Sequence, residues 1–135
     1  MRMMNLASIE NENARKTFYP TPPALADKLM QGIDWNFAQS VLEPSAGKGD
    51  LARAAANKMY KARRGFPVYD EHSKREALEQ ADIDCVEIDS FLRRQLDDAG
   101  FRVVHDDFLT FETQKRYDLI LMNPPFDRGA EHLLH

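Results

Sequence analysis

Four short apolar runs alternate with helix-like segments along most of this 135-residue chain. The runs lie at residues 40–43, 83–89, 101–108 and 117–122, and polar or glycine-rich residues follow or end each of them. Strands that alternate with helices are typical of a parallel sheet whose right-handed crossovers contain the helices. The sequence therefore predicts an α/β fold.

The segments between the runs have the patterns of helices. Residues 18–33 carry a proline-rich turn followed by an apolar face formed by Leu25, Leu29 and Met30. Further helices are expected within 49–64, which is alanine-rich with a basic last turn, and within 90–100, which ends in a capping glycine. Residues 63–81 are expected to form a surface excursion that ends in a short helix at 74–80.

The composition is that of an ordinary globular domain, with 43% apolar and 30% charged residues. Residues 1–16 are polar and aperiodic, which predicts a flexible leader before a domain at 17–135. The net charge of -4 argues against a broad nucleic-acid-binding surface, although a local basic strip is compatible with it. The single cysteine, Cys85, excludes an internal disulfide framework and a multi-cysteine zinc site. No export signal or membrane span is visible, so we expect a cytoplasmic protein.

The residues that could bind a ligand or take part in a reaction lie at the ends of the four runs. In open α/β sheets, ligands bind beyond the carboxyl ends of the strands. The residues delivered there are Glu43 to Asp50 after the first run, Glu87 and Asp89 in the second, Asp106 and Asp107 in the third, and Asn123, Pro124, Pro125 and Phe126 after the fourth. We therefore expect one ligand site at this edge.

Gly47 and Gly49 mark the first loop as a place where the backbone passes close to a ligand. A Walker A motif is excluded, because Lys48 is followed by glycine rather than by serine or threonine. Residues 47–52 do match the dinucleotide pattern G-x-G-x-x-A, with Glu87 as the candidate acidic partner of ribose hydroxyls. Both an NAD-type and another adenosine-containing cofactor therefore remain open on this loop alone.

Five segments, in order, resemble motifs of amino-group methyltransferases that use S-adenosylmethionine. The resemblance is to the gamma class of DNA adenine-N6 methyltransferases and covers roughly residues 17–128. Listed along the chain, the segments are "FYPTPPALADKL" (motif X), "VLEPSAGKGD" (motif I), "CVEID" (motif II), "DDFL" (motif III) and "NPPF" (motif IV). The resemblance implies a Rossmann-like methyltransferase fold with about four parallel strands in the order 3-2-1-4, counted along the chain, without the family's C-terminal strands.

The resemblance also implies roles for individual residues. Thr21 would meet the methionine carboxylate of the cofactor, and Glu43, Ala46 and Gly47 would line its methionine and ribose part, in one loop with Ser45 and Gly49. Glu87 would accept hydrogen bonds from the ribose hydroxyls, while Ile88 would pack on the adenine. Asp107 and Phe108 would contact the adenine amine and ring. No metal is implied.

The fourth motif would hold the methyl acceptor. An exocyclic amine on an aromatic base is a poor nucleophile, because its lone pair is delocalised into the ring. The Asn123 side-chain oxygen and the Pro124 carbonyl would accept its two N–H groups and stabilise the developing positive charge. Pro124 and Pro125 stiffen the loop, and Phe126 offers a face on which a flipped base can stack.

The expected function is therefore methyl transfer from S-adenosylmethionine to adenine N6 in DNA. Related motifs also occur in enzymes that methylate guanine N2 in ribosomal RNA or glutamine in a protein, so these substrates remain alternatives, as do a non-catalytic cofactor-binding role and an NAD-dependent dehydrogenase. DNA is the expected partner. Because the fourth run lies near the end of the sequence, a target-recognition domain would be separate or missing.

Overall fold

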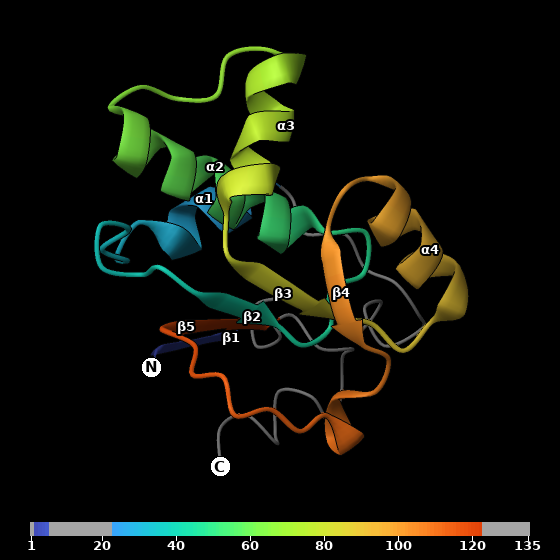
Figure 1. Ribbon diagram of the computed structural model, residues 1–135. Coiled ribbons are helices and arrows are strands. Elements are labelled where there is room, and N and C mark those ends of the chain that lie inside the picture. Colours follow the sequence, from blue (N-terminus) through green and yellow to red (C-terminus); the bar gives the residue numbers. More distant parts are fainter. Residues whose placement is uncertain (1, 6–22, 123–135) are drawn as a thin grey trace.

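A computed structural model describes residues 2–5 and 23–122, and its centre is a parallel five-stranded sheet (Figure 1). The strands are β1 (Arg2–Asn5), β2 (Val41–Glu43), β3 (Ile83–Val86), β4 (Arg102–His105) and β5 (Leu119–Met122). Their order is β1-β5-β2-β3-β4. The four predicted strands therefore lie in the predicted order, and the α/β fold with a Rossmann-like sheet is confirmed.

Strand β1 was not predicted, because residues 1–16 were expected to form a flexible leader. It pairs in parallel with β5, with Arg2 beside Leu119 and Asn5 beside Met122. The fourth predicted strand is therefore an inner strand rather than an edge strand, and β1 satisfies the backbone groups that it would otherwise expose. The rest of the expected leader lies outside the described residues.

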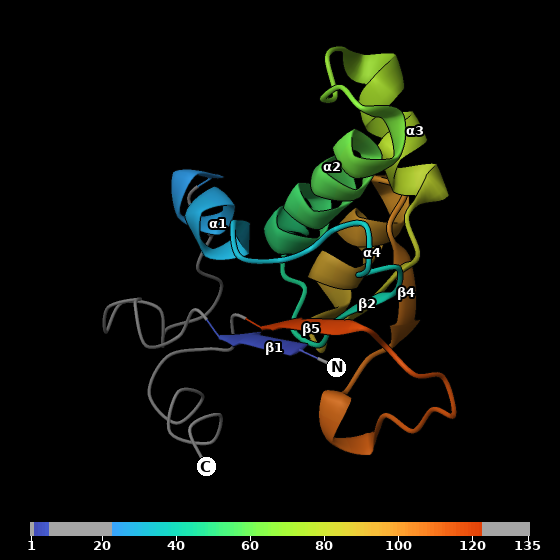
Figure 2. The same cartoon turned by 90° about the vertical axis from the view of Figure 1, so that its left-hand side faces the viewer.

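Side chains along the inner strands alternate between the two faces of the sheet, as the twofold period of a strand requires. On one face, Val41, Ile83, Cys85, Leu119 and Leu121 join the larger core, which also contains buried residues of the helices. On the other face, Leu42 and Val86 pack with Tyr117 in a smaller core. Figure 2 shows the helices on the first side of the sheet and the segment between β4 and β5 on the other. In the described part of the chain, the two faces of the sheet are thus covered by different segments.

The helices are α1 (Pro23–Met30), α2 (Asp50–Arg64), α3 (Glu71–Gln80) and α4 (Ser90–Asp98), with a short 3-10 helix, η2, at Phe108–Thr110. Helix α2 is the central helix. Its buried residues recur at alternating spacings of one and three, so they lie along one side of the helix. These residues are Leu51, Ala52, Ala55, Ala56, Met59 and Tyr60. The small alanine side chains allow α2 to lie close to the sheet. Every helix in the described part of the chain is too short or too polar to cross a membrane.

Helix α3 begins three residues before its predicted start at residue 74. Asp70 accepts a hydrogen bond from the Ser73 backbone N–H, and the Ser73 hydroxyl accepts one from the Asp70 N–H, which forms a capping box. Ser73 and Ala77 are buried, and Ala77 belongs to the larger core. The segment 63–81 is thus part of the packed domain rather than only a surface excursion.

Candidate cofactor site at the carboxyl ends of the strands

The loop after β2 bends over the end of β3. The Ala46 backbone N–H donates to the Val86 carbonyl over 2.9 Å, and the Gly49 N–H donates to the Ala46 carbonyl over 2.8 Å. Gly47 has φ 59° and Gly49 has φ 90°, both in the left-handed region that favours glycine. The predicted glycine-rich turn is therefore present, and it brings Ser45, Ala46 and Gly47 beside the end of the neighbouring strand.

Glu87 links this loop to the segment that follows β3. Its Oε1 accepts the Gly47 backbone N–H over 2.6 Å, and its Oε2 accepts the Asp89 N–H over 2.9 Å. Only 7% of its surface is exposed. Glu87, within the second predicted motif, is thus a fixed carboxylate at the carboxyl edge and is bonded to the first predicted motif through Gly47.

Glu43, the last residue of β2, is more deeply buried, with 1% of its surface exposed. Its Oε1 accepts the Ser45 backbone N–H over 2.8 Å. Burial raises the pKa of Glu43 to about 8; the Ser45 hydrogen bond opposes this shift and the nearby Glu87 charge adds to it. The carboxyl group therefore holds a proton at neutral pH when no positive charge is near.

Gly49 is required by packing as well as by its backbone angle. A Cβ atom at this position would lie 2.6 Å from Cζ of Phe101 and 3.1 Å from Cδ2 of Leu96. Both of these side chains are buried. These close neighbours are protein side chains, so Gly49 places the start of α2 against Leu96 of α4 and against Phe101, which precedes β4. Its approach to a ligand stays a prediction.

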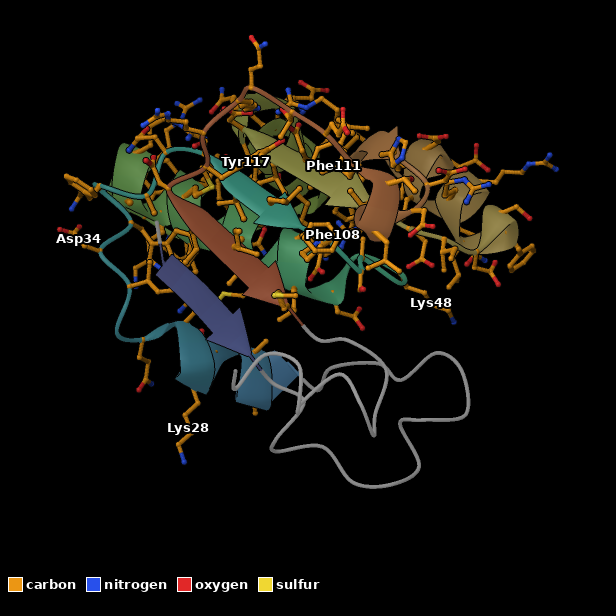
Figure 3. The ribbon with its side chains drawn as sticks, turned by 90° about the horizontal axis from the view of Figure 1, so that it is seen from below. Lys28, Asp34, Lys48, Phe108, Phe111 and Tyr117 are labelled. Atoms are coloured by element: carbon orange, nitrogen blue, oxygen red, sulfur yellow. The ribbon has the colours of Figure 1, made fainter. Side chains whose placement is uncertain are left out.

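Apolar side chains remain uncovered at the adjoining strand ends. Ile88, after β3, is 72% exposed, and Phe108, after β4, is 41% exposed. The two segments are joined by the Glu87 backbone N–H, which donates to the His105 carbonyl over 3.3 Å. Figure 3 shows Phe108 and Lys48 toward the end to which the strands point, whereas Asp34 lies at the other end. A flat apolar ligand group could cover this exposed surface.

Asp107 lies between β4 and η2 and caps the short helix, since its Oδ1 accepts the Leu109 N–H over 2.9 Å. Asp89 has the same role at α4, where it accepts the Leu92 N–H over 3.0 Å. Asp107 is partly buried and its neighbour Asp106 is exposed. Adjacent residues of an extended segment point to opposite sides, which accounts for this difference.

Two groups that stabilise the fold were not predicted from the sequence, one at the candidate site and one inside the sheet. Arg93 of α4 donates to the carbonyls of Glu87 and Ile88 over 2.9 Å and 2.7 Å, which fixes the loop after β3. Asp84, inside β3, is 4% exposed and accepts the Tyr117 hydroxyl over 2.6 Å. A charged residue within the apolar run "IDCV" is a signal that could have indicated such a buried network.

The remaining predicted residues lie outside the part of the chain that the structure describes. They are Thr21, Asn123, Pro124, Pro125 and Phe126. Strand β5, which precedes residues 123–126, ends at Met122 and pairs with β2 in the register Val41–Leu119 and Leu42–Ile120. Within residues 2–5 and 23–122, no group of histidine, cysteine, aspartate and glutamate side chains could hold a metal ion.

Comparison with known proteins gives a family match. The profile of the methyltransferase small domain matches residues 25–135. No curated protein matches significantly, whereas 14 chains of solved structures do. One is the crystal structure of SMU.472, a proposed methyltransferase complexed with SAH. It is 20% identical with a TM-score of 0.48, and the alignment covers 92% of this chain but only 41% of that one.

Proposed function

Because the chain belongs to the methyltransferase small domain family, we propose that it transfers a methyl group from S-adenosylmethionine to an exocyclic amino group. The observation that carries this proposal is the hydrogen bond from the Gly47 N–H to the Glu87 carboxylate. It places the glycine-rich loop and an acidic strand end together at the edge where α/β proteins bind nucleotides. The family match supports S-adenosylmethionine as the cofactor.

The residues at this edge fit the parts of that cofactor. A carboxylate can accept about four hydrogen bonds, and Glu87 uses one on each oxygen, so it retains acceptor capacity for two ribose hydroxyls. Ile88 and Phe108 offer exposed apolar surface for an adenine ring. When bound, S-adenosylmethionine supplies a methyl group on a positively charged sulfur, which is electrophilic without a metal.

Adenine N6 in DNA is the proposed acceptor, and this choice rests on the sequence motif at Asn123–Phe126. The Asn123 amide oxygen and the Pro124 carbonyl would accept the two amino hydrogens, which favours the tetrahedral nitrogen of the transition state. Phe126 would stack on a base that has been rotated out of the duplex. Strand β5, anchored between β1 and β2, leads into this motif.

Methyl transfer can be measured with tritium-labelled S-adenosylmethionine and three acceptors: unmethylated DNA, ribosomal RNA and a release factor. We expect label in DNA adenine, and loss of at least 100-fold in rate for Asn123→Ala, since a transition-state acceptor is removed. Asn36→Ala is the matched control, because Asn36 is an exposed asparagine near the opposite end of the sheet.

Label in RNA or protein alone would reject the DNA acceptor and keep the cofactor chemistry. Calorimetric binding of S-adenosylmethionine without transfer to any acceptor would favour a non-catalytic cofactor-binding role. Binding of NAD in place of S-adenosylmethionine would reject the methyltransferase function.

A further inference from the structure

Two buried carboxylates lie at the proposed cofactor site and are held there by backbone N–H groups. Glu43 is 1% exposed and Glu87 7% exposed. Their hydrogen bonds come from the N–H groups of Ser45, Gly47 and Asp89. The ion pairs between described residues involve other carboxylates, such as Asp27, Glu76 and Asp84. A site of this kind is complementary to a ligand that brings positive charge.

The proposed reaction changes the charge of its cofactor. S-Adenosylmethionine carries a positive sulfur, and loss of the methyl group leaves S-adenosylhomocysteine, in which the sulfur is a neutral thioether. We infer that Glu43 is a specificity-determining residue whose carboxylate makes the site prefer the cationic cofactor to its neutral product. This inference rests on the proposed function and assigns a selective role to one residue within that site.

The geometry favours Glu43 over Glu87 for this role. Glu87 is fixed through both oxygens, to the loop on one side and to the start of α4 on the other. Glu43 ends β2, directly under the loop, and between described residues the hydrogen bond to its carboxylate is the one from Ser45 to Oε1. Glu43 is also the more buried of the two, and Coulomb interactions are strongest where solvent screening is weakest.

Among the groups near Glu43, Glu43 itself is the one whose ionisation would respond to the charge of the ligand. From β3, Cys85 is 0% exposed, and burial raises the pKa of its thiol, which therefore stays neutral. Glu43 follows Val41 by two positions and so faces the same side of the sheet, where the larger core contains buried apolar residues of α2 and β5, among them Leu51 and Leu121. The charged groups Lys48 and Asp50 are exposed, while Glu87 is the nearby charge that opposes ionisation of Glu43.

This arrangement couples cofactor binding to loss of a proton. Burial raises the pKa of Glu43 to about 8 in the ligand-free protein, and a positive sulfur nearby would lower it. Both ligands carry the same α-ammonium and carboxylate groups and differ in charge only at the sulfur. Near pH 7, the positive sulfur of the cofactor would release the Glu43 proton to solvent, whereas the neutral sulfur of the product would leave it in place. The preference for the cofactor should therefore increase with pH up to about 8, where Glu43 is already ionised in the ligand-free protein, and level off above it.

Isothermal titration calorimetry with S-adenosylmethionine and S-adenosylhomocysteine at pH 8.5 tests the inference on the full chain. We expect Glu43→Gln to weaken binding of the cofactor by about ten- to hundredfold, as expected for loss of a partly buried charge interaction. Binding of the product should change by no more than about threefold. Glu79→Gln, at an exposed glutamate of α3, is the matched control, and it should leave the binding of both ligands unchanged.

A second measurement needs no variant and covers the case in which Glu43→Gln does not fold. Titrations of the wild-type protein at pH 7 in two buffers with different ionisation enthalpies give the number of protons released. We expect the cofactor to release close to one proton more than the product does.

Equal weakening of both ligands by Glu43→Gln would overturn the inference, because it would assign Glu43 to a part that the ligands share. Equal proton release for both ligands would overturn it as well. In either case, binding by the wild-type protein would leave the proposed function standing. Failure of both ligands to bind the wild-type protein would instead reject the proposed function, and this inference with it.

Discussion

The Gly47 backbone N–H and the Glu87 Oε1 atom lie 2.6 Å apart, so the loop after β2 is tied to the end of β3. The second oxygen of Glu87 holds the Asp89 N–H at the start of α4. One side chain therefore sets the relative position of the two segments that would hold the ribose. The same contact therefore stabilises the folded loop and positions the residues that are proposed to bind the cofactor.

Glu87→Ala should destabilise the ligand-free protein and weaken cofactor binding. The change leaves the N–H groups of Gly47 and Asp89 without their acceptor, which costs about 1–3 kcal/mol in unfolding free energy. Urea denaturation measures this loss. Glu79→Ala, at an exposed glutamate of α3, should stay within about 0.5 kcal/mol of the wild type. Equal stability of the two variants would contradict the structural role of Glu87.

Gly49→Ala should be much more destabilising than Gly65→Ala. Both glycines have left-handed φ values, 90° and 85°, so both substitutions carry a backbone strain of about 1–2 kcal/mol. At Gly65 nothing lies within 4 Å of the added Cβ, but at Gly49 the Phe101 ring lies 2.6 Å away. Overpacking should add about 1–3 kcal/mol at Gly49 alone.

Thermal and urea unfolding of these two variants separate backbone strain from packing. A difference of less than about 0.5 kcal/mol would show that the Phe101 ring moves aside without cost, and would leave only the φ angle to explain Gly49.

Much of the sheet could be predicted from the sequence because its inner strands are short apolar runs. Leu119 and Leu121, for example, are buried on one face of β5, and the adjacent "NPPF" breaks the run. Strand β1 could not be predicted in this way, because four residues at the edge of a sheet show too little alternation to be told from a loop. Its pairing depends on β5, more than 100 residues along the chain.

The residues of the candidate site that directly follow strands could be predicted from the sequence. Residues that pack against or hydrogen-bond to distant parts of the chain were harder to predict. Glu43 and Glu87 stand at strand ends, so parallel topology alone brings them to one edge. Gly49 was predicted as a glycine of the loop. Its packing against Phe101 could not be predicted, because α4 and β4 come close to Gly49 only in the folded chain. The contact between Tyr117 and Asp84 likewise spans 33 positions in the sequence.

Tyr117→Phe should destabilise the protein by about 1–2 kcal/mol, since it removes the hydroxyl that donates to the buried Asp84. Burial opposes ionisation of Asp84, but hydrogen bonds from Tyr117, Lys115 and Arg102 outweigh it and lower its pKa. Lys115 and Arg102 stay in place in the variant, which limits the loss. Figure 3 shows Tyr117 and Phe111 along the segment that crosses this face of the sheet.

Tyr69→Phe is the control for the loss of a tyrosine hydroxyl, because Tyr69 is 69% exposed. It should change the unfolding free energy by less than about 0.5 kcal/mol. If both tyrosine variants unfold at the wild-type urea concentration, the hydrogen bond from Tyr117 to Asp84 contributes nothing to stability.

Glu43 should make the ligand-free protein less stable as the pH rises. Its pKa is near 4.5 in the unfolded chain and about 8 in the folded one, so between these values the folded state binds more protons. Unfolding free energy therefore falls from about pH 4.5 and levels off above about pH 8. Glu43→Gln cannot ionise, so it should match the wild type at pH 5 within about 1 kcal/mol and exceed it by roughly 2–5 kcal/mol at pH 9. Urea denaturation of both proteins at pH 5, 7 and 9 measures the difference, with Glu79→Gln as the exposed control; a constant offset between the two curves would show that Glu43 is ionised throughout.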